Sequence, residues 1–130
     1  MSDIFVFGSN ELGIHGAGAT KHAKQFFGAI QGQGFGIQGT SFGIPTKASP
    51  SKTLPLDEIR IYVDEFLNYA ADHYWEAFHV TAIGCGLAGY SPEDIAPMFR
   101  QVPENVNLPQ EFKNVLQQIT NMNLIIDVCI

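Results

Sequence analysis

The sequence predicts a single α/β domain built on a mixed, mostly parallel central sheet. Strand-like apolar runs alternate along the chain with segments whose apolar residues recur every three or four positions. This alternation favours crossover connections, which parallel strands require. The chain also has 130 residues with 45% hydrophobic content, enough for one compact core. We therefore expect residues 1–130 to form one domain.

The first third of the chain predicts a strand, a loop and a helix. Residues 4–7 (IFVF) form an apolar run typical of a central strand that is covered on both faces. A loop of turn-forming residues, GSNELGIHG, follows the run. From Gly16 onward, apolar residues then recur at helical spacing. These residues are Ala19, Ala23, Phe26, Phe27 and Ile30.

The middle of the chain predicts a hairpin and a second helix. The glycine-rich stretch QGQGFGIQGTSFGIP favours an exposed loop or hairpin that leads into a short strand over residues 41–44. Pro45 should limit this strand to an edge or an end, because proline cannot donate to the ladder. After a polar loop, a helix is predicted to reach about His73. Its apolar stripe consists of Leu56, Ile59, Val63, Phe66 and Ala70.

The last part of the chain predicts further alternation. Residues 78–83 should form a buried strand. A helix should begin after Ser91 as N-cap, with Pro92 at its first position. Because Pro97 follows within about a turn, that helix should be short or kinked. An extended piece around Val106, a helix over residues 111–122 and a closing strand over residues 123–129 complete the prediction.

Composition excludes several classes of function. The net charge is -6, and no block of lysine or arginine provides the basic face that DNA phosphates require, so we expect no general nucleic-acid binding. The acidic excess also disfavours an anionic membrane surface, and no apolar run reaches the roughly 18 residues of a membrane span. The N-terminus lacks the basic region of a secretory signal. We expect a cytoplasmic protein that neither spans nor binds membranes.

Cysteine and histidine positions predict neither a metal site nor a cofactor. Cys85 and Cys129 are far apart, and neither lies in a metal-ligand spacing. Both are expected to be reduced thiols. No oligomeric state is predicted.

Two glycine-rich loops carry the functional signal. They cover residues 8–18 and 84–90, and each follows a predicted strand and precedes a predicted helix. Because ligands of parallel sheets bind outside the carboxyl ends of the strands, we expect both loops at the same rim. Glycines present unhindered backbone N–H groups, which suit a phosphate at a helix start. The pair predicts a ligand with a diphosphate group. The alternative is that the glycines only allow tight turns and close packing.

Other motifs are weaker. The phosphate-binding pattern GxxxxGK[ST] is absent, and the stretch from Gly13 to Gly18 fits GxGxxG only in scrambled spacing. Cys85, in IGCGLAGY, fits a small packing thiol better than a nucleophile, even though His15 could approach it. Lys47 should lie near the sheet rim, where its amine could contact phosphate or act as a nucleophile. An exposed, solvated lysine is the alternative.

Four segments of the chain carry a further signal: GIHGAGATKHAKQFFGA, IPTKAS, VTAIGCGLAGYSPEDIAPMF and NLIIDV. Together they resemble the macrodomains, which are three-layer α/β/α proteins that recognise ADP-ribose and in some cases hydrolyse it from proteins or nucleic acids. It is closest to the class of the terminal ADP-ribose protein glycohydrolase, with related bacterial and phage proteins. It covers most of residues 3–100 and the last predicted strand, and residues 101–120 have no counterpart.

The resemblance implies a small-molecule nucleotide ligand such as ADP-ribose, held between the two loops. It implies that Lys47 attacks the distal ribose and that Asn10 orients a ribose or a water. The implied ligand-binding residues are Ser9, Asn10, Gly16, Ala17, Gly18, Thr46, Gly84, Cys85, Gly86, Leu87, Ala88, Gly89 and Tyr90.

The sequence departs from this class at Ala88. The class has an aspartate directly after GCGL that assists ribose opening, whereas alanine can neither take nor give a proton. Asp94 and Glu11 are the nearest candidates to replace that acid. The expected pair of catalytic groups is therefore incomplete.

Three functions remain open. The first is a binder of ADP-ribose-type ligands, with or without weak hydrolase activity. The second is an enzyme that uses Lys47 together with Asn10 or an acid from elsewhere in the chain. The third is a non-catalytic phage or bacterial accessory protein whose surface makes protein contacts. Phe35, Phe42 and Tyr90 could serve such contacts, or they could wall an adenine.

Overall fold

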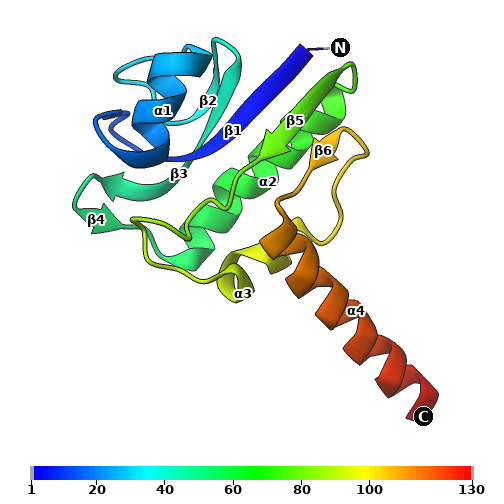
Figure 1. Ribbon diagram of the computed structural model, residues 1–130. Helices are drawn as coiled ribbons and strands as arrows, with labels where there is room; N and C mark the ends of the chain where they lie inside the picture. The colour runs from blue at the N-terminus through cyan, green and yellow to red at the C-terminus, as the bar shows by residue number, and fades with distance from the viewer. Residues whose placement is uncertain (1, 130) are drawn as a thin grey trace.

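The computed structural model describes residues 2–129, with side chains over residues 2–123. In this part of the chain, six strands form one sheet in the order β2-β3-β1-β5-β6, with β4 paired to β3 off this path (Figure 1). The pairs β1–β3, β1–β5 and β5–β6 are parallel, whereas β2–β3 and β3–β4 are antiparallel. The predicted α/β fold with a mixed, mostly parallel sheet is therefore confirmed. The strands are β1 (Ser2–Asn10), β2 (Gly36–Gln38), β3 (Ser41–Ser49), β4 (Lys52–Thr53), β5 (Glu76–Val80) and β6 (Val106–Asn107).

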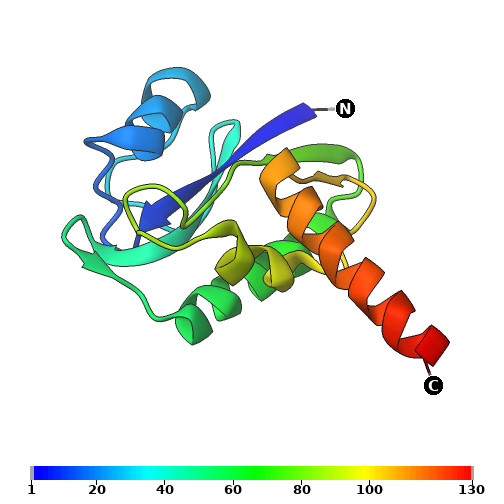
Figure 2. The ribbon, with the colours of Figure 1, turned by 60° about the horizontal axis from the view of Figure 1, so that its bottom comes forward.

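Helices lie on both faces of the sheet. Figure 2 shows α1 on one side, and α2 with α3 on the other. The alternation of side chains along β1 explains this arrangement, because successive residues of a strand point to opposite faces. Phe7 packs with Ala23 of α1, whereas Val6 packs in the cluster that contains α2. The helices are α1 (Gly18–Phe27), α2 (Leu56–Asp72), α3 (Pro92–Ile95) with the 3-10 turn η1 (Ala96–Phe99), and α4 (Gln110–Cys129).

The larger core lies between the sheet and α2. Phe66 of α2 packs edge-on against Phe42 of β3 and Phe78 of β5, with ring centroids 5.0 and 5.6 Å apart. The predicted stripe of α2 is confirmed, since the structure buries Ile59, Val63, Phe66 and Ala70. Burying a phenylalanine side chain of this kind stabilises a fold by about 1.5–3 kcal/mol. This packing joins α2 to β3 and to β5, the strand that leads into the second glycine-rich loop.

Two further predictions are confirmed. The helix after Ser91 is short, and the carboxylate of Asp94 accepts hydrogen bonds from the Ser91 N–H and hydroxyl at 3.1 and 3.0 Å. The extended piece at Val106 is β6. Within residues 2–129, no helix is long and apolar enough to cross a membrane.

The prediction of a short strand over residues 41–44 that Pro45 limits to an edge or an end is wrong. β3 continues to Ser49 and lies between β1 and β2. The proline is tolerated because pairing with β2 stops at Gly43 and pairing with β4 starts at Lys47. On that side Pro45 faces no partner strand, so it resembles a residue of an edge strand locally.

The prediction of a closing strand over residues 123–129 is also wrong. The backbone of α4 continues as a helix to Cys129, and the helix extends away from the sheet (Figure 1). The sequence contains no glycine or proline after Pro109 that would stop the helix. A short apolar run such as NLIIDV fits a strand or a helix equally well. That part of the macrodomain resemblance therefore has no matching strand here.

The glycine-rich stretch before β3 is a hairpin, as predicted, but it is only partly exposed. Gly34 is buried, and a Cβ atom placed on it would lie 2.1 Å from the carbonyl oxygen of Asn10. The carbonyl of Gly34 accepts a hydrogen bond from the hydroxyl of Ser9. The stretch therefore supports the end of β1 and the first glycine-rich loop from below the surface.

Candidate functional site

A pocket of about 400 Å³ opens where β1, β3 and β5 end, and both glycine-rich loops line it. The structure thus brings the two loops to one rim, as their positions after parallel strands predict. Eleven of the predicted residues line this pocket. They are Ser9, Asn10, Gly16, Ala17, Gly18, Thr46, Lys47, Gly84, Gly86, Leu87 and Ala88. Cys85, Gly89 and Tyr90 do not line it.

The first loop is held by side chains beneath it. Asn10 is buried, its Oδ1 accepts the N–H of Ile14 at 3.0 Å, and its Nδ2 donates to the Ile14 carbonyl at 2.9 Å. His15 is also buried, and its Nε2 lies 3.0 Å from the carbonyl of Gln33, which makes Nε2 the protonated nitrogen. The main-chain N–H of His15 donates to Gln31 at 3.1 Å. The side-chain amide of Asn10 therefore holds the first loop in place. The resemblance implies a different role for this amide, the orientation of a ribose or a water.

The start of α1 presents free donors to the pocket. The N-cap residue is Ala17, which has no capping side chain, and the first turn carries no acidic residue. The first internal helix bond runs from Lys21 N–H to the Ala17 carbonyl at 3.3 Å. In the described part of the chain, no hydrogen bond uses the N–H groups of residues 16–20. An uncapped helix start carries a partial positive charge and suits an anion.

The second loop is held by its carbonyls and by one aromatic side chain. Tyr90 donates its N–H to the Gly84 carbonyl at 2.8 Å and its hydroxyl to the Leu54 carbonyl at 2.6 Å. The carbonyl of Ala88 accepts the hydroxyl of Thr53 at 3.0 Å. Over residues 86–88, none of the described hydrogen bonds uses a main-chain N–H. Gly89 and Tyr90 thus shape the loop from outside the pocket.

Both loops engage several of their carbonyls within the protein, and each leaves one run of N–H groups free, at residues 16–20 and 86–88. The carbonyls of Ile14, Ala17, Ala82, Gly84, Gly86 and Ala88 each accept an internal hydrogen bond. The hydroxyl groups in the pocket are also engaged. Ser9, Thr20, Thr46 and Thr81 donate to the carbonyls of Gly34, Ala17, Ser9 and Val6, respectively. Apart from the ammonium of Lys47, the donors left for a ligand are therefore mainly main-chain N–H groups.

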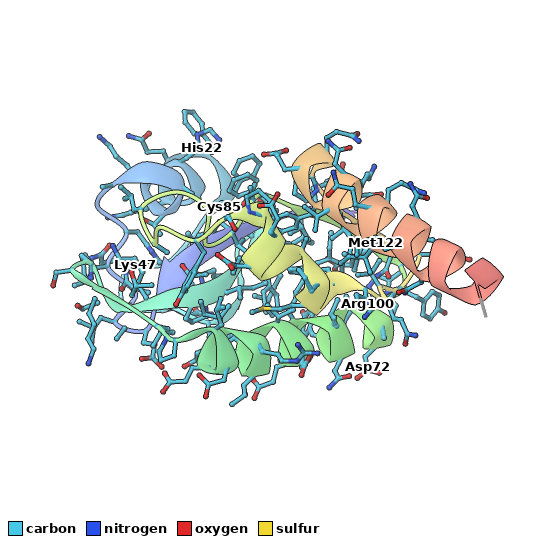
Figure 3. The ribbon with its side chains drawn as sticks, turned by 90° about the horizontal axis from the view of Figure 1, so that it is seen from below. His22, Lys47, Asp72, Cys85, Arg100 and Met122 are labelled. Atoms are coloured by element: carbon cyan, nitrogen blue, oxygen red, sulfur yellow. The ribbon has the colours of Figure 1, made fainter. Side chains whose placement is uncertain are left out.

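Lys47 adds a positive charge to these donors. The register of β1 and β3 pairs it with Asn10, and its Nζ donates to the carbonyl of Pro50. An ammonium group has three donors, so two remain for a ligand. Among the described residues that line the pocket, Lys47 is the only one with an ionisable side chain. Figure 3 shows it at the β3–β4 hairpin, apart from Cys85 in the second loop.

Cys85 has the properties of a packing thiol. It packs against the main core, and its Sγ lies 3.5 Å from the carbonyl of Ile83. Burial, followed by the negative charges of Glu111, Asp94 and Glu93, raises the pKa of the Cys85 thiol to about 11. A thiol with a raised pKa is protonated at neutral pH and is a poor nucleophile.

The two acids considered as replacements at Ala88 are engaged elsewhere. Glu11 accepts the hydroxyl of Tyr62 at 2.5 Å, and Asp94 caps α3. Neither lines the pocket, and no other carboxylate of the described residues does. The aromatic residues Phe35 and Phe42 line a separate hollow beside α2.

The sequence prediction missed several residues of the lining. Among them, Thr81 could have been found from its position at the end of the third parallel strand, and Ile14 from its place in the first loop. Pro50 lies in the turn between β3 and β4, which the sequence suggested only as a polar loop.

Comparisons of the chain with protein-family models, with curated proteins and with solved structures find no match.

Proposed function

We propose that this protein is a macrodomain-like binder of ADP-ribose or a related nucleoside diphosphate, held in the pocket between the two glycine-rich loops. One observation carries the proposal: the free N–H groups of residues 16–20 and 86–88 border the same pocket. The placement of α1 and α2 on opposite faces of the sheet supports the three-layer arrangement that the resemblance implies.

Physical chemistry favours an anion in this pocket. Glycine loops with several free N–H groups form concavities that bind phosphate groups. The start of α1 and the ammonium of Lys47 add positive potential, and no carboxylate of the described lining opposes it. A pocket volume of about 400 Å³ suits a ligand larger than a single phosphate. A diphosphate linked to a sugar fits these requirements.

The same lining supports binding more than hydrolysis. Transfer or hydrolysis of a ribosyl group benefits from a group that exchanges a proton with the reacting atoms. Ala88 provides none, and the amide of Asn10 is engaged in holding the first loop. Lys47 alone provides a charge and donors, which stabilise a bound diphosphate. We therefore place the protein among binders.

Isothermal titration calorimetry with ADP-ribose tests the proposal. In Gly86→Glu, a carboxylate enters the pocket, and we expect affinity to fall about 100-fold because like charges a few ångströms apart repel by about 3 kcal/mol. No atom lies within 4 Å of a Cβ placed on Gly86, so the variant should fold. Gly86→Gln, of the same size but neutral, should lose much less affinity.

Gln118→Glu, on an exposed position of α4, adds the same charge outside the pocket lining and should bind as the wild type does. Equal affinity of the wild type and Gly86→Glu would contradict the loop assignment. Absence of heat and of thermal stabilisation at millimolar ADP-ribose would contradict the proposal itself. That result would favour the alternative of a protein-interaction module on the same scaffold.

A further inference from the structure

We infer that this pocket recognises the diphosphate and sugar of its ligand and does not discriminate the base, so that it accepts nucleoside diphosphate sugars of different bases. The inference rests on the proposed function and narrows it to a class of ligands. Its basis is the set of hydrogen-bonding groups that the lining leaves free.

Most of the main-chain groups that the lining leaves without a partner are donors. Each base presents its own pattern of donors and acceptors along its edge, so a protein needs both kinds of group, fixed in place, to tell bases apart. In this lining, the carbonyls of Ile14, Ala17, Gly84, Gly86 and Ala88 are already hydrogen-bonded within the protein. The N–H groups of residues 16–20 and 86–88 are free. A row of donors matches phosphate oxygens, whereas the exocyclic amines of adenine, guanine and cytosine need acceptors.

The polar side chains of the lining are engaged in internal hydrogen bonds, so a ligand does not find them free to turn toward its base. The amide of Asn10 is bonded to both the N–H and the carbonyl of Ile14. The hydroxyls of Thr46 and Thr81 point to main-chain carbonyls, at 3.4 and 2.8 Å. A site that discriminates strongly between ligands has buried polar groups that are left unpaired when the wrong ligand is bound. In this pocket, these polar groups are already paired without a ligand.

The lining also lacks a surface for stacking. Over the described residues, no aromatic side chain lines the pocket. Phe35 packs edge-on against Phe42 with ring centroids 5.5 Å apart, in the separate hollow beside α2. The hydroxyl of Tyr90 is bound to Leu54. Aliphatic side chains such as Ile14 and Leu87 form the apolar part of the wall, and such contacts are similar for every base.

Calorimetric titration with three ligands that differ only in the base tests this inference. The ligands are ADP-ribose, GDP-ribose and CDP-ribose. We expect dissociation constants that agree within about threefold, since no base-specific contact distinguishes them. Preference for one base by about tenfold or more, the effect of a stacking partner or a specific hydrogen bond, would overturn the inference.

The two proposals fail in different ways. If none of the three ligands binds, the proposed function is wrong and the inference falls with it. If ADP-ribose binds and the other two do not, the proposed function stands and only the inference is wrong. As a further check, Lys47→Gln should weaken all three ligands by the same factor, because its amine contacts the shared diphosphate. A factor that depends on the base would overturn the inference.

Discussion

The hydroxyl of Thr53 on β4 donates a hydrogen bond of 3.0 Å to the main-chain carbonyl of Ala88 in the second glycine-rich loop. The two residues are 35 positions apart in the sequence. Their contact ties the loop to the β3–β4 hairpin, which begins its pairing at Lys47. The free N–H groups of residues 86–88 and the ammonium of Lys47 are thereby held at a fixed separation, as preorganised binding of an anion requires.

Thr53→Val should therefore weaken ADP-ribose binding. The substitution keeps the shape of the side chain and removes the hydroxyl, which costs about 1 kcal/mol, or about fivefold in affinity. Calorimetry measures the change. Thr40→Val is the matched control, because it removes a hydrogen bond to Phe27, 3.3 Å long, outside the pocket lining. The interpretation fails if both variants bind ADP-ribose equally well.

Gly34→Ala should destabilise the protein strongly. Its Cβ would lie 2.1 Å from the carbonyl oxygen of Asn10, so the backbone beneath the first loop must shift. Such overpacking costs about 3 kcal/mol, which corresponds to about 10 °C in Tm. Thermal unfolding followed by circular dichroism measures it. Gly16→Ala is the control, since no atom lies within 4 Å of its added Cβ. A Tm for Gly34→Ala close to that of Gly16→Ala would contradict the described packing.

The sequence predicted the parallel core of the fold and the location of the pocket well, because both depend on local patterns. The apolar run in β1 and the α2 stripe ending at Ala70 follow periodicities that can be counted. The two loops could be assigned to one rim because parallel strands have their carboxyl ends on the same side. What each side chain does there was less predictable. Asn10 looked available for a ligand, but its amide is engaged by Ile14, which only the folded loop reveals.

The incorrect predictions share a physical cause. Pro45 lies inside β3 because neither β2 nor β4 pairs with it on their side of the strand, and this depends on the pairing of distant segments. Gly34 was expected to be exposed, yet the end of β1 covers it. Residues 123–129 carry a pattern compatible with a strand, and the helix that precedes them continues through them. In each case tertiary context decides what the local pattern leaves open.

Tyr62→Phe should lower stability in a way that depends on pH. The hydrogen bond to Glu11, then burial and the charges of Glu11, Glu65 and Glu58, raise the pKa of Tyr62 to about 12. The folded state thus holds the phenolic proton more tightly than the unfolded state, where the pKa is about 10. The resulting stabilisation is complete below about pH 10 and is lost as pH rises toward 12. Removal of the hydrogen bond at pH 7 should cost about 1 kcal/mol.

Urea unfolding at pH 7, 9 and 11 measures this dependence. The difference between the wild type and Tyr62→Phe should be the same at the two lower values and smaller at pH 11. Tyr74→Phe is the control, because Tyr74 is 75% exposed and its hydroxyl makes none of the described hydrogen bonds. A difference that stays constant up to pH 11 would show that the phenol of Tyr62 does not titrate as its contact with Glu11 requires.

Lys47→Ala should separate binding from catalysis. The ammonium of Lys47 is the only ionisable side chain among the described residues of the lining, and no carboxylate there can exchange a proton with a ribose. We therefore expect the wild type to release no ADP-ribose from an ADP-ribosylated protein above the rate of a no-enzyme control, as followed by chromatography. Lys47→Ala should leave this result unchanged while weakening ADP-ribose binding about tenfold, through loss of one charge-assisted contact.

Lys47→Arg is the control, because it keeps the charge and should retain most of the affinity. Release by the wild type that disappears in Lys47→Ala would instead identify the lysine as a catalytic group, and the pocket would then be an active site that works without the carboxylate missing at Ala88.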